Sequence, residues 1–359
     1  MKGVKGPYAL ISYNSKDKKI WFGRDPLGRN LTPSLFLEDQ PSSPEFLKAS
    51  RLLRVTLDDL VKRMVTGISS LHQKTEKESR VAVLFSGGLD CTTLAFLAHS
   101  HIPPSESIDL LNVAFENTRL ISNNHQTKRI QKDSEKSSAD NHDSNTTFDV
   151  PDRQTGERLW RELSKLTPGR DWRFAEYLEH KENIIKLMRA NLTVMDLARG
   201  IGNSHLNEQV GSLVVFILTS LSPPMIYRTP AQVLISGLGA DELLGGYSRH
   251  RSAFLTTSLS SNSWERLLDV LAMDLERIST QNLGRDDRMM SWRVIDLLSG
   301  LPVHLKPDHG LGKGLGDNLL LRGLAHGLRL VESCRLPKRA IQFGAQSAKL
   351  DGNSKGQAG

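Results

Sequence analysis

The sequence predicts an α/β protein in which a mostly parallel sheet carries helices on both faces. An apolar run at 81–85 leads through a glycine turn into a helical pattern at 91–98. A second apolar run follows at 108–115, and a strand that returns through a helix to another strand implies parallel pairing. A third short apolar run, 233–235, opens into another glycine turn at 236–242. This repeated order of strand, turn and helix predicts the fold class.

The length and composition of the chain limit its class. Its 359 residues are enough for two domains, and a hydrophobic share of 38% is low for one fully packed globule. We therefore expect part of the chain to be disordered. The net charge of +7 suits ATP, pyrophosphate or nucleic acid alike. The Lys and Arg residues are scattered without a dense basic block, so a nucleic-acid partner is not expected.

Cysteine use and hydropathy indicate a cytoplasmic protein. The two cysteines, Cys91 and Cys334, cannot build a disulfide framework, which favours a reducing compartment. The first residues lack the apolar core of a signal peptide. The longest apolar run, around 213–218, is too short to cross a bilayer, so no membrane association is expected.

The first part of the chain predicts a hairpin followed by a helix. Two short apolar runs, 8–13 and 19–23, flank a polar turn at 14–18. A Pro/Ser linker is expected at 41–44. Apolar residues at helical spacing then predict a helix over 52–71.

The remaining segments alternate between helical patterns and polar stretches. Residues 117–147 hold almost no apolar anchor, and such a stretch cannot bury enough surface to offset its ordering entropy. We expect it to be a disordered insertion. Helical patterns cover 153–166 and 174–189, and the last third, 264–350, is helical with glycine-rich breaks. The polar tail at 351–359 is expected to be flexible.

The loop Ser86-Gly87-Gly88-Leu89-Asp90 has the chemistry of an anion site. Gly87 and Gly88 let backbone N–H groups approach phosphate oxygens that a Cβ would keep away. The helix that follows directs its free N–H groups to the same place, and Ser86 adds a hydroxyl donor. Asp90 can hold Mg²⁺ among phosphates. No lysine follows, so this is not the common NTPase loop. The alternative is an ordinary glycine-rich turn.

The second glycine turn repeats this chemistry. Residues 236–247 read Ser-Gly-Leu-Gly-Ala-Asp-Glu-Leu-Leu-Gly-Gly-Tyr. Asp241 and Glu242 can join Asp90 around Mg²⁺ if the two strands lie side by side, because ligands of open α/β sheets bind at the carboxyl ends of the strands. The alternative is a capped helix start with no ligand.

Several strings in the chain carry a resemblance to a known family. They are SGGLD at 86–90, SGLGADELLGGYSRHR at 236–251, NLGRDDRMM at 282–290, LLLR at 319–322 and LPKRAIQFG at 336–344. The first of these resembles the pyrophosphate-binding loop of ATP pyrophosphatases, which cleave ATP to AMP. The whole set resembles the synthetase domain of asparagine synthetases, enzymes of the glutamine amidotransferase family.

The resemblance implies a fold and a domain division. The sheet would be of the adenine nucleotide alpha hydrolase-like kind. Residues 1–46 would be a truncated β remnant of an Ntn-type glutaminase domain, since 7–31 resembles the last part of that domain. Residues 47–350 would form the ATP-binding domain around the 117–147 insertion, followed by the tail.

The resemblance also implies a reaction and its site residues. ATP would adenylate the side chain of aspartate, and ammonia would displace AMP to give asparagine. The pyrophosphate would be held by Ser86, Gly87, Gly88 and Asp90. The adenosine would be framed by Leu84, Val113, Ser236 and Gly237. Mg²⁺ would be bound by Asp90 and Asp241.

Three departures from the family concern catalysis. The chain has no cysteine before Cys91, so glutamine hydrolysis is not expected. Leu238 stands where the synthetases carry a glutamate, and leucine cannot accept a proton. Asn318 stands where the family carries a charge-stabilising lysine, and Lys313 lies upstream of that position. The sequence therefore identifies no catalytic residue. Lys338 is expected either to reach phosphate or to be a surface charge.

Two further departures concern length. The segments after Asp196 and Ser291 are shorter than the family pattern, as in a splice variant or an imperfect gene model. Three functions therefore stay open. The first is an impaired, ammonia-dependent amide ligase. The second is a non-catalytic protein that binds nucleotide or a protein partner. The third is a tRNA-modifying ATP pyrophosphatase.

Overall fold

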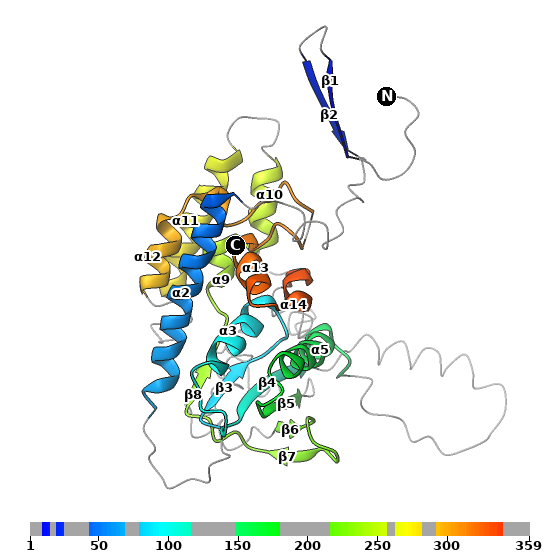
Figure 1. Cartoon of the computed structure of the whole chain (residues 1–359), viewed down its shortest axis with the longest axis vertical. Helices are drawn as coiled ribbons and strands as arrows, with labels where there is room; N and C mark the ends of the chain where they lie inside the picture. Colours follow the sequence, from blue (N-terminus) through cyan, green and yellow to red (C-terminus); the bar gives the residue numbers. More distant parts are fainter. Residues whose placement is uncertain are drawn as a thin grey trace, which may run out of the picture.

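The computed structural model describes nine stretches of the chain, and everything below refers to them. They are residues 9–14, 19–24, 43–68, 79–115, 148–179, 216–256, 263–281, 292–312 and 314–339. Figure 1 shows a layer of strands at one end and a group of helices above it.

A six-stranded sheet is the centre of the fold. Its strands are β3 (Val81–Leu84), β4 (Ile108–Phe115), β5 (Trp172–Glu179), β6 (Phe216–Leu218), β7 (Met225–Tyr227) and β8 (Val233–Ile235). Their order across the sheet is β7-β6-β5-β4-β3-β8. The pairs β8–β3, β3–β4 and β4–β5 are parallel, whereas β5–β6 and β6–β7 are antiparallel. This arrangement confirms the predicted α/β class with a mostly parallel sheet.

The register places the two glycine turns at one edge of the sheet. Val81 of β3 lies opposite both Ile108 of β4 and Val233 of β8. All four residues of β3 are buried, as expected for a central strand with no polar side chain. Since β3 and β8 run in the same direction and in register, the loops that leave them start side by side.

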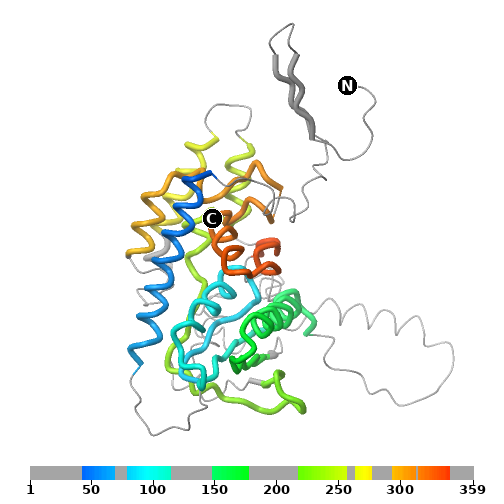
Figure 2. Tube along the Cα trace, in the orientation of Figure 1, coloured from blue at the N-terminus to red at the C-terminus, as the bar shows by residue number. Residues whose placement is uncertain are grey.

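The described helices surround this edge and extend away from it. They are α2 (Pro44–Thr66), α3 (Leu89–His99), α5 (Pro151–Leu166), α9 (Ala240–Leu244), α10 (Ser248–Thr256), α11 (Ser263–Gln281), α12 (Trp292–Gly300), α13 (Leu319–Gly327) and α14 (Val331–Arg335), with a 3-10 turn η2 (Val303–Leu305). Helix α3 contacts β3 and β8, and it also contacts α2, α5, α13 and α14. In Figure 2 the early helix α2, in blue, lies beside the late helix α12, in orange. One hydrophobic core therefore joins the two halves of the sequence.

Helix α2 begins earlier than the sequence predicts. The Ser43 hydroxyl accepts a hydrogen bond from the Phe46 N–H at 3.1 Å, and Pro44 occupies the first turn. A serine cap followed by proline is a helix-start signal, because proline has no N–H to leave unpaired there. The expected linker at 41–44 thus ends in the cap of α2, and the expected start at residue 52 was wrong.

Strand β5 corrects a second expectation, a helix over 174–189. Residues 172–179 pair in parallel with β4 along their whole length, and Phe174 and Tyr177 are buried. The buried Glu176 is satisfied by Arg153 at 2.7 Å. Sheet pairing outweighed a weak helical pattern, and the aromatic residues at the start of the segment were the missed strand signal. The rest of the predicted helix lies outside the described residues.

Other expectations agree with the structure. The predicted hairpin is formed by β1 (Ala9–Asn14) and β2 (Lys19–Arg24). These two strands pair with each other in antiparallel fashion and form a sheet separate from the six-stranded one. Strand β4 has the predicted bounds, and α5 differs from the prediction by two residues at its start. The proposed insertion at 117–147 and the tail at 351–359 lie outside the described residues.

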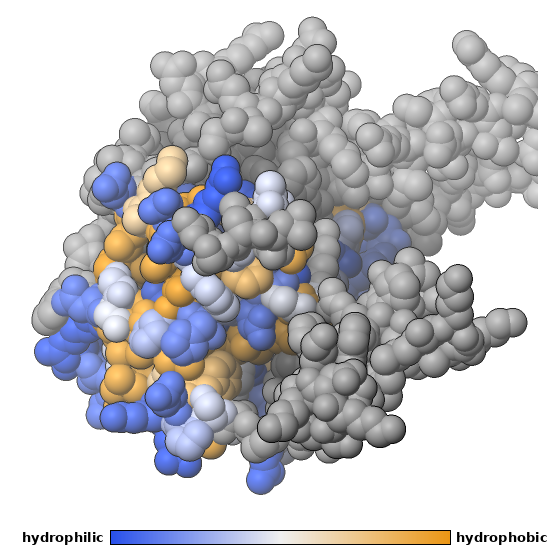
Figure 3. Space-filling view, turned by 90° about the horizontal axis from the view of Figure 1, so that it is seen from above, coloured by the Kyte–Doolittle hydropathy of each residue, from blue (hydrophilic) through white to orange (hydrophobic). Residues whose placement is uncertain are grey.

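Some apolar side chains of the described helices are exposed. On α10 and α11 they include Leu255, Trp264, Leu268 and Met273. Figure 3 views the molecule from above and shows hydrophobic residues, in orange, lying between hydrophilic ones, in blue. None of the described helices has the length and apolar character needed to span a membrane.

Candidate functional site

The two glycine loops are in direct contact. Gly237, in the loop after β8, lies so near the first loop that a Cβ on it would come 2.9 Å from the Cβ of Asp90. A side chain at position 237 would therefore push the loops apart. The contact follows from the parallel pairing of β3 with β8, which no local sequence pattern determines.

The first loop is enclosed by the start of α5. Gly87 has a φ of +69°, and a Cβ there would overlap the backbone of Thr155 and Gly156. The Thr155 hydroxyl donates to the Ser86 carbonyl oxygen at 2.9 Å. Helix α3 begins immediately after Gly88, which has no side chain to cap the helix N–H groups. Glycine is needed at Gly87 both for its positive φ and for this close approach.

The carboxylates of the two loops share one lysine. The Lys338 ammonium lies 2.7 Å from Oδ2 of Asp90 and 2.8 Å from Oδ2 of Asp241. Both aspartates are buried, and the lysine side chain is 15% exposed. The structure thus brings together Asp90 and Asp241, as the sequence predicted, and adds a cation from a segment 248 residues after Asp90.

Burial and charge act against each other in this cluster. Burial lowers the pKa of Lys338, but the carboxylates of Asp241 and Asp90 outweigh burial and raise that pKa well above its usual range. Burial raises the pKa of Asp90, and the nearby Asp241 raises it further, while Lys338 lowers it. The lysine is therefore firmly protonated, and one ammonium serves two acidic groups.

Asn318 supports the second carboxylate. Its side-chain amide donates to Oδ1 of Asp241 at 2.9 Å, and the residue is fully buried at the N-cap of α13 with a φ of 53°. Gly246 lies against this pair, and a Cβ on it would overlap both side chains. Asn318 thus lies inside the site, as a neutral donor to Asp241. A positive charge enters the site from Lys338 instead.

The oxygen acceptors of the site outnumber its donors. Asp90 Oδ1, Glu242 Oε2 and Asn318 Oδ1 are buried and make no hydrogen bond with the described residues. The other oxygen of Glu242 accepts a hydrogen bond from the Tyr247 hydroxyl at 2.8 Å. Burial, and after it the charge of Asp241, raises the pKa of Glu242. Unpaired buried acceptors of this kind fit a further cation or a ligand that donates hydrogen bonds.

The donor set fits Mg²⁺ in company with phosphates. The described residues form no group of three or more His, Cys, Asp or Glu side chains able to hold a metal ion. A nucleotide site needs fewer protein ligands, because Mg²⁺ is usually held by one or two carboxylates together with substrate phosphates. Asp90, with its unpaired Oδ1, and Asp241 meet that requirement.

The residues expected at the adenosine lie at the same edge of the sheet. Leu84 ends β3 and Val113 lies near the end of β4, the next strand, while Ser236 and Gly237 follow β8. Leu238 is half-buried in the second loop, and its N–H donates to the Ser236 hydroxyl at 3.4 Å. Its side chain offers no acid or base to the site. Lys313 and the segments around residues 196 and 291 lie outside the described residues.

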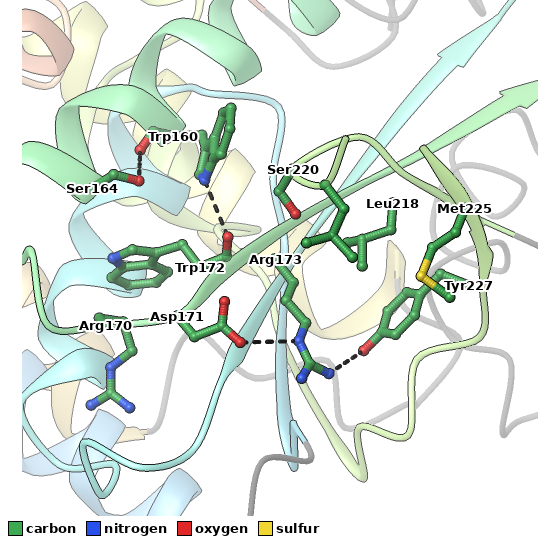
Figure 4. A pocket seen from close by; sticks show the side chains of 11 residues that line it. Trp160, Ser164, Arg170, Asp171, Trp172, Arg173, Leu218, Ser220, Met225 and Tyr227 are labelled. Carbon is green, nitrogen blue, oxygen red and sulfur yellow. Dashed lines mark hydrogen bonds and ion pairs between the residues drawn. The ribbon is translucent and has the colours of Figure 1, made fainter. Parts of the chain in front are cut away.

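A pocket of about 450 Å³ lies away from these loops. It is formed at the amino end of β5 by side chains from α5, β5 and the segment from β6 to β7. Figure 4 shows Trp160 and Trp172 on one side and Leu218, Met225 and Tyr227 on the other, with the Asp171–Arg173 ion pair between them. Strand β5 is parallel to β3, so the pocket and the two glycine loops occupy opposite edges of the sheet.

Taken together, the fold and the site define a general class. A parallel sheet with two glycine loops and buried charges at its carboxyl edge is the architecture of nucleotide-binding α/β proteins. No protein-family model matches the chain. Curated relatives, however, match over most of its length.

The chain is similar to proteins called asparagine synthetase domain-containing protein 1. It is 35% identical to the Mus musculus protein over 362 residues, covering 90% of this chain and 55% of the relative. The Homo sapiens protein is 36% identical over 308 residues, covering 77% and 46%. Another asparagine synthetase domain-containing protein, from Saccharomyces cerevisiae, is 28% identical, covering 99% of this chain and 74% of the relative. Over most of its own length the chain is thus a relative of asparagine synthetase domain-containing proteins, and it spans about half the length of the mammalian relatives it matches.

Solved structures give a weaker likeness. An NH3-dependent NAD synthetase from Campylobacter jejuni is 12% identical, with a TM-score of 0.27, and covers 74% of this chain and 98% of its own. A likeness of this size carries no argument about function.

Proposed function

We propose that the chain binds ATP between the two glycine loops and activates a carboxylate by AMP-forming adenylation. The observation that carries the proposal is the contact of Lys338 with both Asp90 and Asp241 beside those loops. Two buried carboxylates and one mostly buried ammonium suit a polyphosphate with its metal. Similarity to asparagine synthetase domain-containing proteins favours aspartate as the carboxylate and ammonia as the later nucleophile.

In the first step a carboxylate oxygen of the substrate bonds to the α-phosphorus of ATP, and the bond from that phosphorus to the bridging oxygen breaks. Pyrophosphate leaves with the electron pair. The N–H groups at the start of α3 and the Ser86 hydroxyl would bind its oxygens. Lys338 would stabilise the charge that develops at phosphorus. Mg²⁺, held by Asp90 and Asp241, would supply charge neutralisation of the phosphates.

In the second step an amine attacks the acyl carbon, AMP leaves, and the nitrogen must lose a proton. Leu238 stands where the family places a base, so this step is expected to be slow. We therefore propose an adenylating protein with weak amide synthesis. The same observation favours a second candidate, a protein that binds nucleotide without completing a reaction.

Exchange of labelled pyrophosphate into ATP tests the proposal, because it reports adenylation without the amine step. We expect aspartate-dependent exchange by the wild-type protein and a loss of about 10²-fold or more in Lys338→Met. Binding of ATP without any exchange, across a panel of carboxylic acids, would favour the second candidate. Absence of ATP binding would reject both.

A further inference from the structure

Lys338 holds one oxygen of each carboxylate. Asp90 Oδ1 has no partner among the described residues, but Oδ1 of Asp241 already accepts a hydrogen bond from Asn318, so a metal ion that joins the two carboxylates must take Oδ2 of Asp241 from the ammonium. The Lys338 ammonium lies 2.7 and 2.8 Å from Oδ2 of Asp90 and Oδ2 of Asp241. Mg²⁺ binds oxygen at about 2.0–2.1 Å and requires close, nearly octahedral ligands. The ammonium and a metal ion cannot both bridge these two oxygens at once. The arrangement in which Lys338 bridges them therefore excludes the arrangement in which Mg²⁺ does.

The charges make it costly to separate Lys338 from the two aspartates unless another anion takes their place. Two buried carboxylates side by side repel each other, and Lys338 neutralises one of the two charges. A metal ion that displaced the lysine would leave an ammonium in a mostly buried place, where an unpaired charge is costly. The Lys338 ammonium can therefore leave the two aspartates only if another anion lies within reach of its Nζ.

The backbone that carries Lys338 is fixed from two sides. The Leu336 carbonyl oxygen accepts a hydrogen bond from the buried Arg322 guanidinium at 2.9 Å. Gly314, with a φ of +85°, lies so close to Pro337 that a Cβ would come 2.9 Å from its Cα. The four-carbon stem of the lysine lets its ammonium change partners while these backbone contacts stay in place.

We infer that Lys338 couples metal binding to nucleotide binding in this site. Without nucleotide the lysine occupies the carboxylates and keeps a divalent cation out. A nucleotide phosphate supplies the anion to which the ammonium transfers, and the metal then takes the freed oxygens. The inference rests on the proposed function for the identity of the anion, but its first consequence, poor binding of metal alone, does not depend on any activity.

Titration with Mn²⁺ alone, followed by the electron paramagnetic resonance of free Mn²⁺, tests the inference on the full chain without nucleotide. Lys338→Met keeps the length of the side chain and removes its charge, and Lys338→Gln is a second neutral variant. Lys165→Met removes an exposed lysine on α5 and serves as the matched control. Circular dichroism and the thermal midpoint show that each variant is folded.

We expect both Lys338 variants to bind Mn²⁺ at least about ten-fold more tightly than the wild type, and Lys165→Met to match the wild type. With a non-hydrolysable ATP analogue present, the gain should shrink or reverse, because the neutral variants lose a phosphate partner. Equal Mn²⁺ affinity for wild type, Lys338→Met and Lys338→Gln without nucleotide would overturn the inference. Failure of every protein to bind the analogue would instead overturn the proposed function and leave the metal-only comparison valid.

Discussion

The side-chain amide of Asn318 donates a hydrogen bond across 2.9 Å to Oδ1 of Asp241, while Lys338 holds the other oxygen of the same carboxylate. The carboxylate is thus fixed at both oxygens, one by a neutral donor and one by a cation. Asn318 is separated from Asp241 by 77 residues and from Lys338 by a further helix pair, α13 and α14. The orientation of Asp241 is therefore set by the C-terminal part of the fold.

Replacement of Asn318 should disturb Asp241 and leave the rest of the fold intact. Asn318→Ala leaves Oδ1 of a buried carboxylate without its donor, a loss of about 1–3 kcal/mol in the free energy of unfolding. Asn318→Asp should cost more, since it adds a like charge beside Asp241. Urea unfolding of both variants shows which substitution lowers the free energy of unfolding more. An Asn318→Asp protein as stable as wild type at neutral pH would contradict this account of the contact.

Gly246 leaves the space in which Asp241 and Asn318 meet. In Gly246→Ala the new methyl group would overlap both side chains, so we expect a loss of about 1–3 kcal/mol in unfolding free energy together with weaker nucleotide binding. Gly300→Ala is the matched control, because nothing lies within 4 Å of a Cβ at the end of α12. If the two variants lose equal stability, the close packing around Gly246 does not matter.

Leu238→Glu should restore a proton acceptor to the second loop. We expect amide formation from aspartate, ATP and ammonia to rise by about 10²-fold, while pyrophosphate exchange stays close to the wild-type rate. Leu238→Gln is the control, because glutamine has nearly the same shape as glutamate but cannot act as a base. The rate of asparagine formation, measured by chromatography, distinguishes the two variants. Robust amide synthesis by the unchanged protein would show that the missing glutamate is not limiting.

Asp109 gives a prediction for the dependence of stability on pH. Burial raises the pKa of this residue to about 6, although hydrogen bonds from Thr229 and Tyr227 lower it. The unfolded value is about 3.9, so between these values the folded protein binds more protons than the unfolded one. The Asp109 contribution to stability is therefore largest at low pH and falls as the pH rises towards 6.

The comparison with Asp109→Asn isolates this effect from other carboxylates. Between about pH 4.5 and about pH 7, the wild type should lose about 2 kcal/mol of unfolding free energy relative to the variant. Urea unfolding of both proteins at the two pH values gives the difference. A difference that stays constant with pH would mean that Asp109 titrates normally in the folded protein.

The sequence was sufficient for features that depend on short apolar runs and glycine turns. The bounds of β4 and the presence of β3 followed from local pattern. The adjacency of the Asp90 and Asp241 loops was predicted only on the condition that β3 and β8 are neighbours, which the structure shows. Features fixed by distant partners did not follow. The sequence of β5 is compatible with a helix, and its pairing with the distant strand β4 makes it a strand.

Lys338 shows the same limit within the site. The short string around it allows either a phosphate contact or a surface charge, and only the path of the chain after α14 brings it to Asp90. Asn318 was expected at the place of a missing cation, yet the charge comes from Lys338, farther along the sequence. A contact across 248 residues leaves no local signal in a single sequence.

Calorimetric titration of ATP in the presence of Mg²⁺, with wild type and Asp90→Ala, tests the central claim most directly. The claim is that the two glycine loops and their carboxylates form one nucleotide site. Asp171→Ala removes an exposed carboxylate at the pocket of Figure 4 and is the control. We expect Asp90→Ala to bind at least about ten-fold more weakly than wild type, because the metal loses a ligand, and Asp171→Ala to bind like wild type. Equal affinity of wild type and Asp90→Ala, or a loss confined to Asp171→Ala, would contradict the claim.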